Sequence, residues 1–367
     1  MTVTLGVPGQ IMPPASRAIA YAQRAEADGF ESVWWPDHLM GWQPDALWTT
    51  EFTPLAAVQK SPHTHFDPLS MMSAVGAVTE RIKVGVAVTD TIRRHPAMLA
   101  MESLTIDHIA GGRSILGLGS GERLNLTPYG IEFEKPVARL AEAIEVIRLL
   151  WRSDGPVDFD GRFFKLRSAV LGLDPYEGRA PPIWLASHGP RMLELCGTSA
   201  DGWIPTKCEP EEYAARLEAI RAAAAKAGRD GDAITPSMLG YVLCAPDEET
   251  LQRMCEHPLV RMLCILLPAK EYRAVGAEPP FEGESGFHAF IPTEALRAEA
   301  ERVVAAIPPA LVRRATFHGD ATMIAEQVRA YQKAGLRDLV LWNVTAFADP
   351  SLAGYSFKVL RELRELL

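Results

Sequence analysis

Residues 82–119 read IKVGVAVTDTIRRHPAMLAMESLTIDHIAGGRSILGLG, with a short apolar run at each end. The runs 82–88 and 114–119 are rich in β-branched residues and glycine and are bounded by turn residues, which indicates buried strands. The longer segment between them, from Pro96 to Ile109, has a helical pattern that begins with proline. Two buried strands joined by a helix predict a parallel strand-helix-strand unit.

The same alternation extends over the rest of the chain. Helical patterns also follow the first strands, over 18–27 and 68–78. Counting 237–245, about eight strands are expected, and no change in composition separates two halves. Beyond the two strands already named, the strand-like runs lie at 4–7, 32–35, 182–187, 202–205, 237–245 and 338–344.

This repetition predicts an α/β fold, a (β/α)₈ TIM barrel in a single domain over 1–367. A doubly wound sheet usually ends after fewer strands and leaves a linker. A barrel core takes about 250 residues, so the remainder is expected as insertions in the loops that follow strands. The predicted insertions lie near 40–66, 122–179 and 268–309, the last as a long loop or lid.

Composition excludes several classes of protein. The 367 residues are 48% hydrophobic with a net charge of −9, and Lys and Arg are spread singly, so nucleic acid is not an expected partner. Five cysteines without a Cys-x-x-Cys pair argue against a disulfide framework or a zinc site. No N-terminal targeting pattern and no apolar run of about 20 residues occurs. We therefore expect a soluble cytoplasmic protein that acts on a small molecule and holds no metal.

Polar residues follow most of the predicted strands. In a barrel, the carboxyl ends of the strands meet at the active site, so these residues should converge. They are Asp37-His38, Thr89-Asp90, Gly119 to Glu122, Ser187-His188 and Thr206-Lys207.

Asp37-His38 lies in VWWPDHLMGW, residues 33–42, between tryptophans. A histidine beside a carboxylate suits general acid or base catalysis, because its charge changes near neutral pH. The alternative is a capping Asp followed by a structural His, and the surrounding tryptophans favour function.

Two other strand ends have more than one interpretation. GLGSGERLN, 117–125, is no dinucleotide loop, because its glycine spacing and strand position are wrong. Its glycines either admit something flat to the backbone or keep a barrel strand small for packing. ASHGPRM, 186–192, enters a helix through Gly-Pro and places Arg191 at an anion-binding helix N-terminus, unless it is an ordinary loop.

The ordered set SVWWPDHLMGW, VGVAVTDTIRRHPA, LGLGSGERLN, VDFDGRFFKL, ASHGPRM and DGWIP resembles the luciferase-like superfamily of (β/α)₈ barrels, in the branch that uses the 5-deazaflavin coenzyme F420. Within this branch the chain resembles the phthiodiolone dimycocerosate ketoreductases, and it is also similar to F420-dependent glucose-6-phosphate dehydrogenase. The resemblance implies a hydride-transferring oxidoreductase that acts on a carbonyl or alcohol, in the manner of a ketoreductase.

The resemblance also implies roles for single residues. His38 would exchange the substrate proton, Glu122 would serve the deazaflavin ring or its proton transfer, and Trp42 would wall the hydride path. A non-proline cis peptide, Ala87-Val88, would press against the face of the cofactor. Further cofactor contacts are implied at Asp37, Thr89, Ser120, Gly121, Asn125, His188, Gly189 and Arg191.

The substrate is less defined by the resemblance. Lys207 and Arg314 are candidate phosphate ligands, which keeps a sugar-6-phosphate dehydrogenase as an alternative. Glu209 stands where the sugar-phosphate enzymes have a lysine. The chain also has many apolar residues after the second strand, from Trp42 to Leu55, and over 259–267. These could line an apolar pocket, pack the loops together or form a dimer contact. An FMN-dependent monooxygenase and a non-catalytic ligand-binding barrel remain as further alternatives, and relatives suggest a homodimer.

Overall fold

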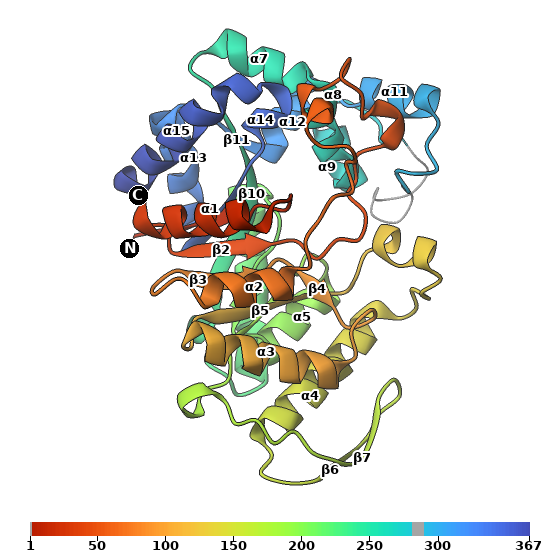
Figure 1. The fold of residues 1–367 in the computed structure, drawn as a ribbon, viewed down its shortest axis with the longest axis vertical. Coiled ribbons are helices and arrows are strands. Elements are labelled where there is room, and N and C mark those ends of the chain that lie inside the picture. Colours follow the sequence, from red (N-terminus) through yellow and green to blue (C-terminus); the bar gives the residue numbers. More distant parts are fainter. Residues whose placement is uncertain (1, 281–289) are drawn as a thin grey trace.

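The computed structural model describes residues 2–280 and 290–367, and its centre is a closed barrel of eight parallel strands (Figure 1). The final strand pairs with the first, Thr4 opposite Asp338 and Gly6 opposite Val340, and this pairing closes the barrel. The predicted (β/α)₈ TIM barrel is therefore confirmed. The barrel strands are β1 (Thr4–Pro8), β2 (Ser32–Trp35), β3 (Lys83–Val86), β5 (Ser114–Gly119), β8 (Ile183–Leu185), β9 (Gly202–Trp203), β10 (Thr235–Cys244) and β12 (Asp338–Asn343).

Two short strands were not expected from the sequence. The strand β4 (Thr89–Asp90) continues the line of β3 beyond a break and pairs with the end of β5. The strand β11 (Thr316–Gly319) pairs with the upper half of β10, with Tyr241 opposite Thr316. Its sequence, TFHG, is too short and too polar to stand out as a buried strand.

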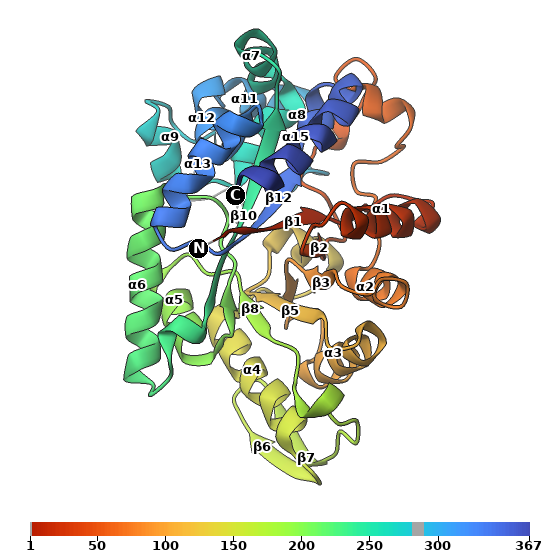
Figure 2. The same cartoon turned by 90° about the vertical axis from the view of Figure 1, so that its left-hand side faces the viewer.

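Helices follow the strands and surround the barrel, and the two chain ends lie on the same side of it (Figures 1 and 2). Several begin with proline, whose fixed φ suits a first helical position. Asp67 and Asp320 each cap a helix, 68–76 and 321–333, by accepting a backbone N–H group. The surrounding helices are α1 (Ala15–Ala27), α2 (Pro68–Gly76), α3 (Pro96–Ala110), α4 (Pro136–Arg152), α5 (Pro190–Ser199), α6 (Pro210–Lys226), α13 (Ala321–Lys333) and α15 (Ala353–Leu366).

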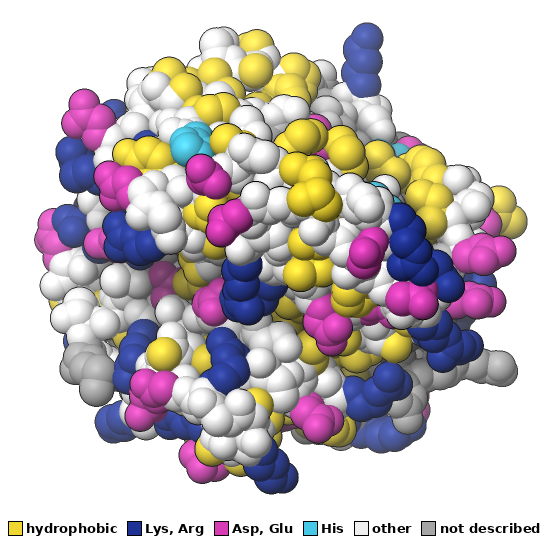
Figure 3. Space-filling model, turned by 90° about the horizontal axis from the view of Figure 1, so that it is seen from below, with side chains coloured by type: hydrophobic (Ala, Val, Ile, Leu, Met, Phe, Trp, Pro, Cys, Tyr) yellow, Lys and Arg dark blue, Asp and Glu magenta, His cyan; other side chains and the backbone are white. Residues whose placement is uncertain are grey.

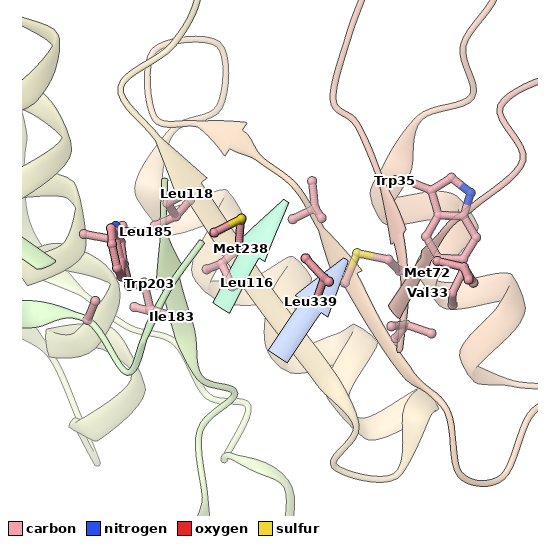
Figure 4. Packing of buried hydrophobic residues seen from close by; sticks show 14 of the residues in the cluster. Val33, Trp35, Met72, Leu116, Leu118, Ile183, Leu185, Trp203, Met238 and Leu339 are labelled. Atoms are coloured by element: carbon pink, nitrogen blue, oxygen red, sulfur yellow. The ribbon is translucent and has the colours of Figure 1, made fainter. Parts of the chain in front are cut away.

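The strands divide their side chains between two apolar layers, because successive residues point to opposite faces. Val33 and Trp35 of β2 belong to the layer between barrel and helices, with Met72 of α2, as Figure 4 shows. Trp34, between them in sequence, belongs to the barrel interior with Trp184, and their ring centroids are 5.2 Å apart. This alternation explains why three of the four residues of β2 are bulky and apolar.

A third apolar cluster covers one end of the barrel. It comes mainly from the segment between β10 and β11, and Leu47 of the 40–66 segment joins it. Figures 1 and 2 show these helices gathered at one end of the molecule and the hairpin of β6 (Val157–Asp160) and β7 (Lys165–Ala169) at the other. The helices are α7 (Glu248–Glu256), α8 (Pro258–Arg261), α9 (Ala269–Ala274), α11 (Arg297–Ala305) and α12 (Pro309–Ala315), and α14 (Thr345–Ala348) follows β12.

The 268–309 segment, expected as a long loop or lid, contains α9 and α11, while 281–289 lie outside the described residues. The 122–179 segment holds α4 and the hairpin. Of the helices that the structure describes, none is long and apolar enough to cross a membrane. On the face seen in Figure 3, acidic and basic side chains are intermixed, without a broad field of one sign.

Candidate active site

A cavity of about 350 Å³ opens at the carboxyl ends of the barrel strands. Most of the residues that the sequence predicted as site residues line it. A larger hollow of about 550 Å³ lies at the opposite strand ends, beside Lys83 and Asp338, but TIM-barrel active sites occupy the carboxyl face. The predicted residues that line the cavity are Asp37, His38, Trp42, Ala87, Val88, Thr89, Ser120, Gly121, Glu122, Asn125 and His188.

His38 and Glu122 face one another in the cavity. His38 follows β2 and Glu122 follows β5, and the His38 Nε2 and Glu122 Oε2 atoms are 3.7 Å apart. Asn125 lies behind both, with its Nδ2 at 3.0 Å from Glu122 Oε2 and 3.1 Å from His38 Nδ1. Two groups that can each hold or release a proton therefore share one small space.

Asp37 lines the cavity, but its oxygens already accept several hydrogen bonds. Thr89 donates to Oδ2 at 2.6 Å, Arg94 donates to the same oxygen at 3.3 Å, and Arg93 approaches Oδ1 at 3.4 Å. Arg93 also pairs with Asp90, at 2.5 Å, and donates to the Asp37 carbonyl. The Asp37 carboxylate thus joins the loop after β2 to β4 and the turn that follows β4, a role that the sequence did not suggest.

The Ala87-Val88 peptide is cis, as predicted, and forms part of the cavity wall. Gly117 and Gly119 lie next to it on β5. A Cβ at Gly117 would stand 1.9 Å from the Val86 carbonyl oxygen, and one at Gly119 would stand 2.7 Å from the Val88 side chain. Tight packing between neighbouring strands therefore accounts for these two glycines, in agreement with the packing interpretation.

Two rings contact His38 and a third contacts Trp42, and two of these residues, His65 and Tyr241, were not predicted from the sequence as site residues. The His65 ring stacks on His38 with centroids 5.5 Å apart, and Trp42 meets His38 edge-on at 5.9 Å. Burial, and then the nearby His38, lower the pKa of His65 to about 4, so His65 is neutral at physiological pH. Tyr241 lies 6.4 Å from Trp42, and burial followed by the charge of Glu122 raises the pKa of its hydroxyl.

The signal for these residues was weak in the sequence. In the sequence, His65 stands out only as the second histidine of His63-Thr64-His65, a pair that lacks the further ligands of a metal site. Tyr241 lies on β10 two residues after Leu239, so period-two alternation along a barrel strand would have placed both on one face. Leu266, from the apolar segment 259–267, lines the cavity, and the apolar part of the wall that was not predicted is Ile11, Ile204, Leu239, Trp342 and Phe347.

His188, Gly189 and Arg191 stand at the start of α5. Arg216 donates to His188 Nδ1 at 3.1 Å, which leaves the proton of a neutral ring on Nε2, 3.3 Å from Thr206 Oγ1. His188 lines the cavity, whereas Gly189 and the exposed Arg191 stand outside its lining. The three residues remain close together at a helix N-terminus.

The profile of the luciferase-like monooxygenase family matches residues 2–338. The chain belongs to this family. The phthiodiolone/phenolphthiodiolone dimycocerosates ketoreductase of Mycobacterium bovis is 35% identical over 367 residues, with 97% of this chain and 96% of that protein covered. The family predicted from the ordered motifs is therefore confirmed.

Two solved structures share the fold of this luciferase-like chain. An F420-dependent secondary alcohol dehydrogenase in complex with an F420-acetone adduct has a TM-score of 0.77 at 20% identity, with 100% of this chain and 99% of that chain covered. The coenzyme F420 dependent tetrahydromethanopterin reductase from Methanopyrus kandleri has a TM-score of 0.71 at 20% identity, with 95% and 96% covered.

Lys207 and Arg314, the candidate phosphate ligands of this luciferase-like chain, do not line the cavity. Arg314 pairs with Glu209 at 2.9 Å and with Glu271 at 2.6 Å. Lys207 donates from Nζ to the Arg314 carbonyl at 2.6 Å. Both cations thus bind groups of the protein, and these contacts join the loop after β9 to the segment that covers the barrel.

Burial lowers the pKa of Lys207 from 10.5 to about 8. Between about pH 8 and pH 10.5 the unfolded chain binds a proton that the folded chain releases, so the contribution of Lys207 to the free energy of unfolding rises with pH. Below pH 8 the full cost of the buried charge is present. We expect Lys207→Met to remove this dependence. Relative to the wild type, the variant should lose about 3 kcal/mol of unfolding free energy as pH rises from 8 to 10.5.

The measurement is denaturant unfolding of both proteins at several pH values. The pH-dependent difference isolates Lys207, because the other titrating groups are common to the two proteins. The lost hydrogen bond to the Arg314 carbonyl adds only a constant offset. A difference that does not change with pH would contradict the prediction.

Proposed function

We propose that this luciferase-like protein is an F420-dependent oxidoreductase that transfers a hydride between the deazaflavin and a ketone or secondary alcohol. The observation that carries the proposal is the pair His38 and Glu122, 3.7 Å apart in a cavity at the carboxyl end of the barrel. The reaction needs one proton to enter or leave at the substrate oxygen, and this pair is placed to handle it. The ketoreductase relative and the alcohol dehydrogenase with a matching fold support the same chemistry.

The cavity wall fits a flat cofactor with polar edges. The peptide Ala87-Val88 and the residues Ser120 and Gly121 expose backbone and small side chains. Trp42 Nε1 is buried and has no hydrogen-bond partner among the described residues, so it can donate to a bound ligand. We assign the cofactor to this wall, with Thr89 and His188 at its edges and Gly189 and Arg191 toward its anionic tail. Bound F420 would supply or accept the hydride.

The protein residues then position the substrate and exclude water. Trp42 closes the space beside His38, and the apolar wall shields the reacting atoms from solvent. A substrate oxygen that lies within reach of both His38 and Glu122 would be held beside a group that can donate a proton in ketone reduction and accept one in alcohol oxidation.

An uncharged, apolar substrate fits this cavity better than a sugar phosphate. Its wall includes Tyr241, Leu266, Trp342 and Phe347, which offer apolar surface. The two cations proposed from the sequence for a phosphate are engaged elsewhere, Arg314 by Glu209 and Glu271. We therefore favour a ketoreductase-like activity on apolar ketones and their alcohols.

The test has two parts, both with the purified full-length protein. In a fluorescence titration we expect F420 to bind more tightly than FMN. With F420 present, deazaflavin absorbance should change with apolar secondary alcohols or ketones and not with glucose 6-phosphate. Tighter binding of FMN would instead support a flavin monooxygenase, and cofactor binding without any turnover would support a non-catalytic barrel.

Two broader features belong to the same proposal. We propose a homodimer, because α3 exposes Met98, Met101 and Ile109 to solvent, and such exposed apolar groups are candidates for an interface. We also propose a cytoplasmic location, which is supported by five cysteines that form no disulfide.

A further inference from the structure

Asn125 is the most completely engaged polar side chain of the cavity wall. It ends the 3-10 turn Arg123–Asn125 that follows β5, and it is 1% exposed. Its Oδ1 accepts hydrogen bonds from the backbone N–H groups of Leu39, at 2.8 Å, and Met40, at 2.9 Å. One side chain therefore holds the loop that carries His38 and also reaches both members of the acid-base pair.

These contacts decide which way round the amide lies. Two backbone N–H groups meet one end of the Asn125 amide, so that end must be the carbonyl oxygen. The other end is then the NH₂ group, and its two hydrogens are directed at Glu122 Oε2, 3.0 Å away, and His38 Nδ1, 3.1 Å away. If the amide were reversed, its NH₂ group, which is a donor, would face the two backbone N–H donors.

The orientation of Asn125 has a consequence for the His38 ring. A nitrogen that accepts a hydrogen bond holds no proton, so a neutral ring bonded to Asn125 has its hydrogen on Nε2, toward Glu122. The Met40 carbonyl competes, because its oxygen is also 3.1 Å from Nδ1 and would favour a proton there. Buried N–H groups are left unpaired more rarely than carbonyls, so the Asn125 contact should prevail.

We propose that Asn125 is a positioning residue that keeps neutral His38 in its Nε2–H form, so that His38 donates a hydrogen bond to the substrate oxygen while Glu122 exchanges the proton. This inference rests on the proposed function and assigns its two polar groups different tasks. A further titratable side chain, that of His65, stacks on the face of the His38 ring.

The proton balance follows from this assignment. In reduction, the hydride that bound reduced F420 would supply adds to the carbonyl carbon and the C=O electron pair moves to oxygen, which takes the proton of the Glu122 carboxyl group. Glu122 becomes a carboxylate and His38 keeps its Nε2 proton, and alcohol oxidation reverses each step. Glu122 is also the better placed to regain a proton from water, since its side chain is 30% exposed and that of His38 is 12% exposed.

The first test reads the tautomer directly and needs no turnover. In protein with ¹⁵N-labelled histidine, the protonated and bare nitrogens of a neutral ring have well-separated ¹⁵N shifts, and loss of a signal in His38→Gln assigns His38. We expect the Nε2–H form in the wild type. Asn125→Asp keeps the acceptor for Leu39 and Met40 but replaces the donor, so His38 should change to the Nδ1–H or doubly protonated form.

A wild-type Nδ1–H ring would overturn the inference, and so would an Asn125→Asp spectrum identical to that of the wild type. The latter result would mean that Asn125 only clamps the loop. Because the spectrum is recorded without substrate, absence of F420-linked activity would refute the proposed function and leave the conclusion about the His38 tautomer intact.

The second test separates the two tasks by kinetics. Glu122→Gln removes the exchangeable proton and should lower kcat by about 10²-fold to 10⁴-fold. His38→Gln keeps an N–H donor and should retain clearly more activity than His38→Ala. Full activity in Glu122→Gln, or equal losses in the two His38 variants, would contradict the assignment.

Discussion

Replacement of His38 by alanine is expected to lower the turnover of the proposed ketone-alcohol reaction by at least about 10²-fold. The change removes the imidazole whose Nε2 lies 3.7 Å from Glu122, and with it the donor to the developing charge on the substrate oxygen. The loop itself should keep its shape, because Asn125 still binds the backbone N–H groups of Leu39 and Met40. Binding of F420 should therefore change much less than kcat.

The measurement is kcat from deazaflavin absorbance, with a parallel fluorescence titration of the cofactor. His108→Gln is a control, since His108 lies on α3, bonds the Asp174 carbonyl and is not among the residues that line the cavity. It should retain wild-type turnover. If His38→Ala also turned over at the wild-type rate, His38 would have no part in the chemistry.

Gly117→Ala is expected to cost about 3 kcal/mol of stability or more, the upper range for overpacking in a core. The added Cβ would stand 1.9 Å from the Val86 carbonyl oxygen, well inside contact distance. Relief requires the backbone of β3 to move away from β5, although the two strands pair through Gly85 and Ile115. The same shift would displace the Ala87-Val88 wall, so F420 binding should also weaken.

Gly354→Ala is the matched control for that substitution. Gly354 lies in α15, and no atom within 4 Å would meet a Cβ there. Because alanine favours a helix over glycine, this variant should be more stable by about 0.5–1 kcal/mol. Denaturant unfolding compares the two variants. A Gly117→Ala protein as stable as Gly354→Ala would show that the β3–β5 contact is looser than the structure indicates.

Local patterns predicted most of the barrel. The runs at 32–35 and 114–119 became β2 and β5 with the same boundaries, because a buried strand needs an apolar residue at nearly every position. β11 escaped prediction because Phe317 is the one apolar side chain of TFHG, and the segment becomes a strand by pairing with β10. The helices α9 and α11 escaped prediction because Gly and Pro in 268–309 favoured a loop.

The residues of the candidate site also divide into those that the sequence could predict and those that it could not. Residues directly after strands, such as His38 and Glu122, could be expected to meet, since parallel strands end on one face. The position of His65 could not be predicted, because this residue reaches the cavity through a loop that packs closely against Gly41. A Cβ at Gly41 would stand 2.6 Å from the Pro62 carbonyl oxygen of that loop. Lys207 follows a strand as well, yet its amino group bonds Arg314 instead of entering the cavity.

The sequence by itself determined the barrel, the family and the strand-end residues that surround the cavity, because these depend on the order and periodicity of residues along the chain. The tertiary structure alone decided which partner each polar group has. Asn125 shows the reason, since its amide orientation depends on backbone N–H groups 85 and 86 residues away. Hydrogen bonds require distances within a few tenths of an ångström, and only the folded chain sets those distances.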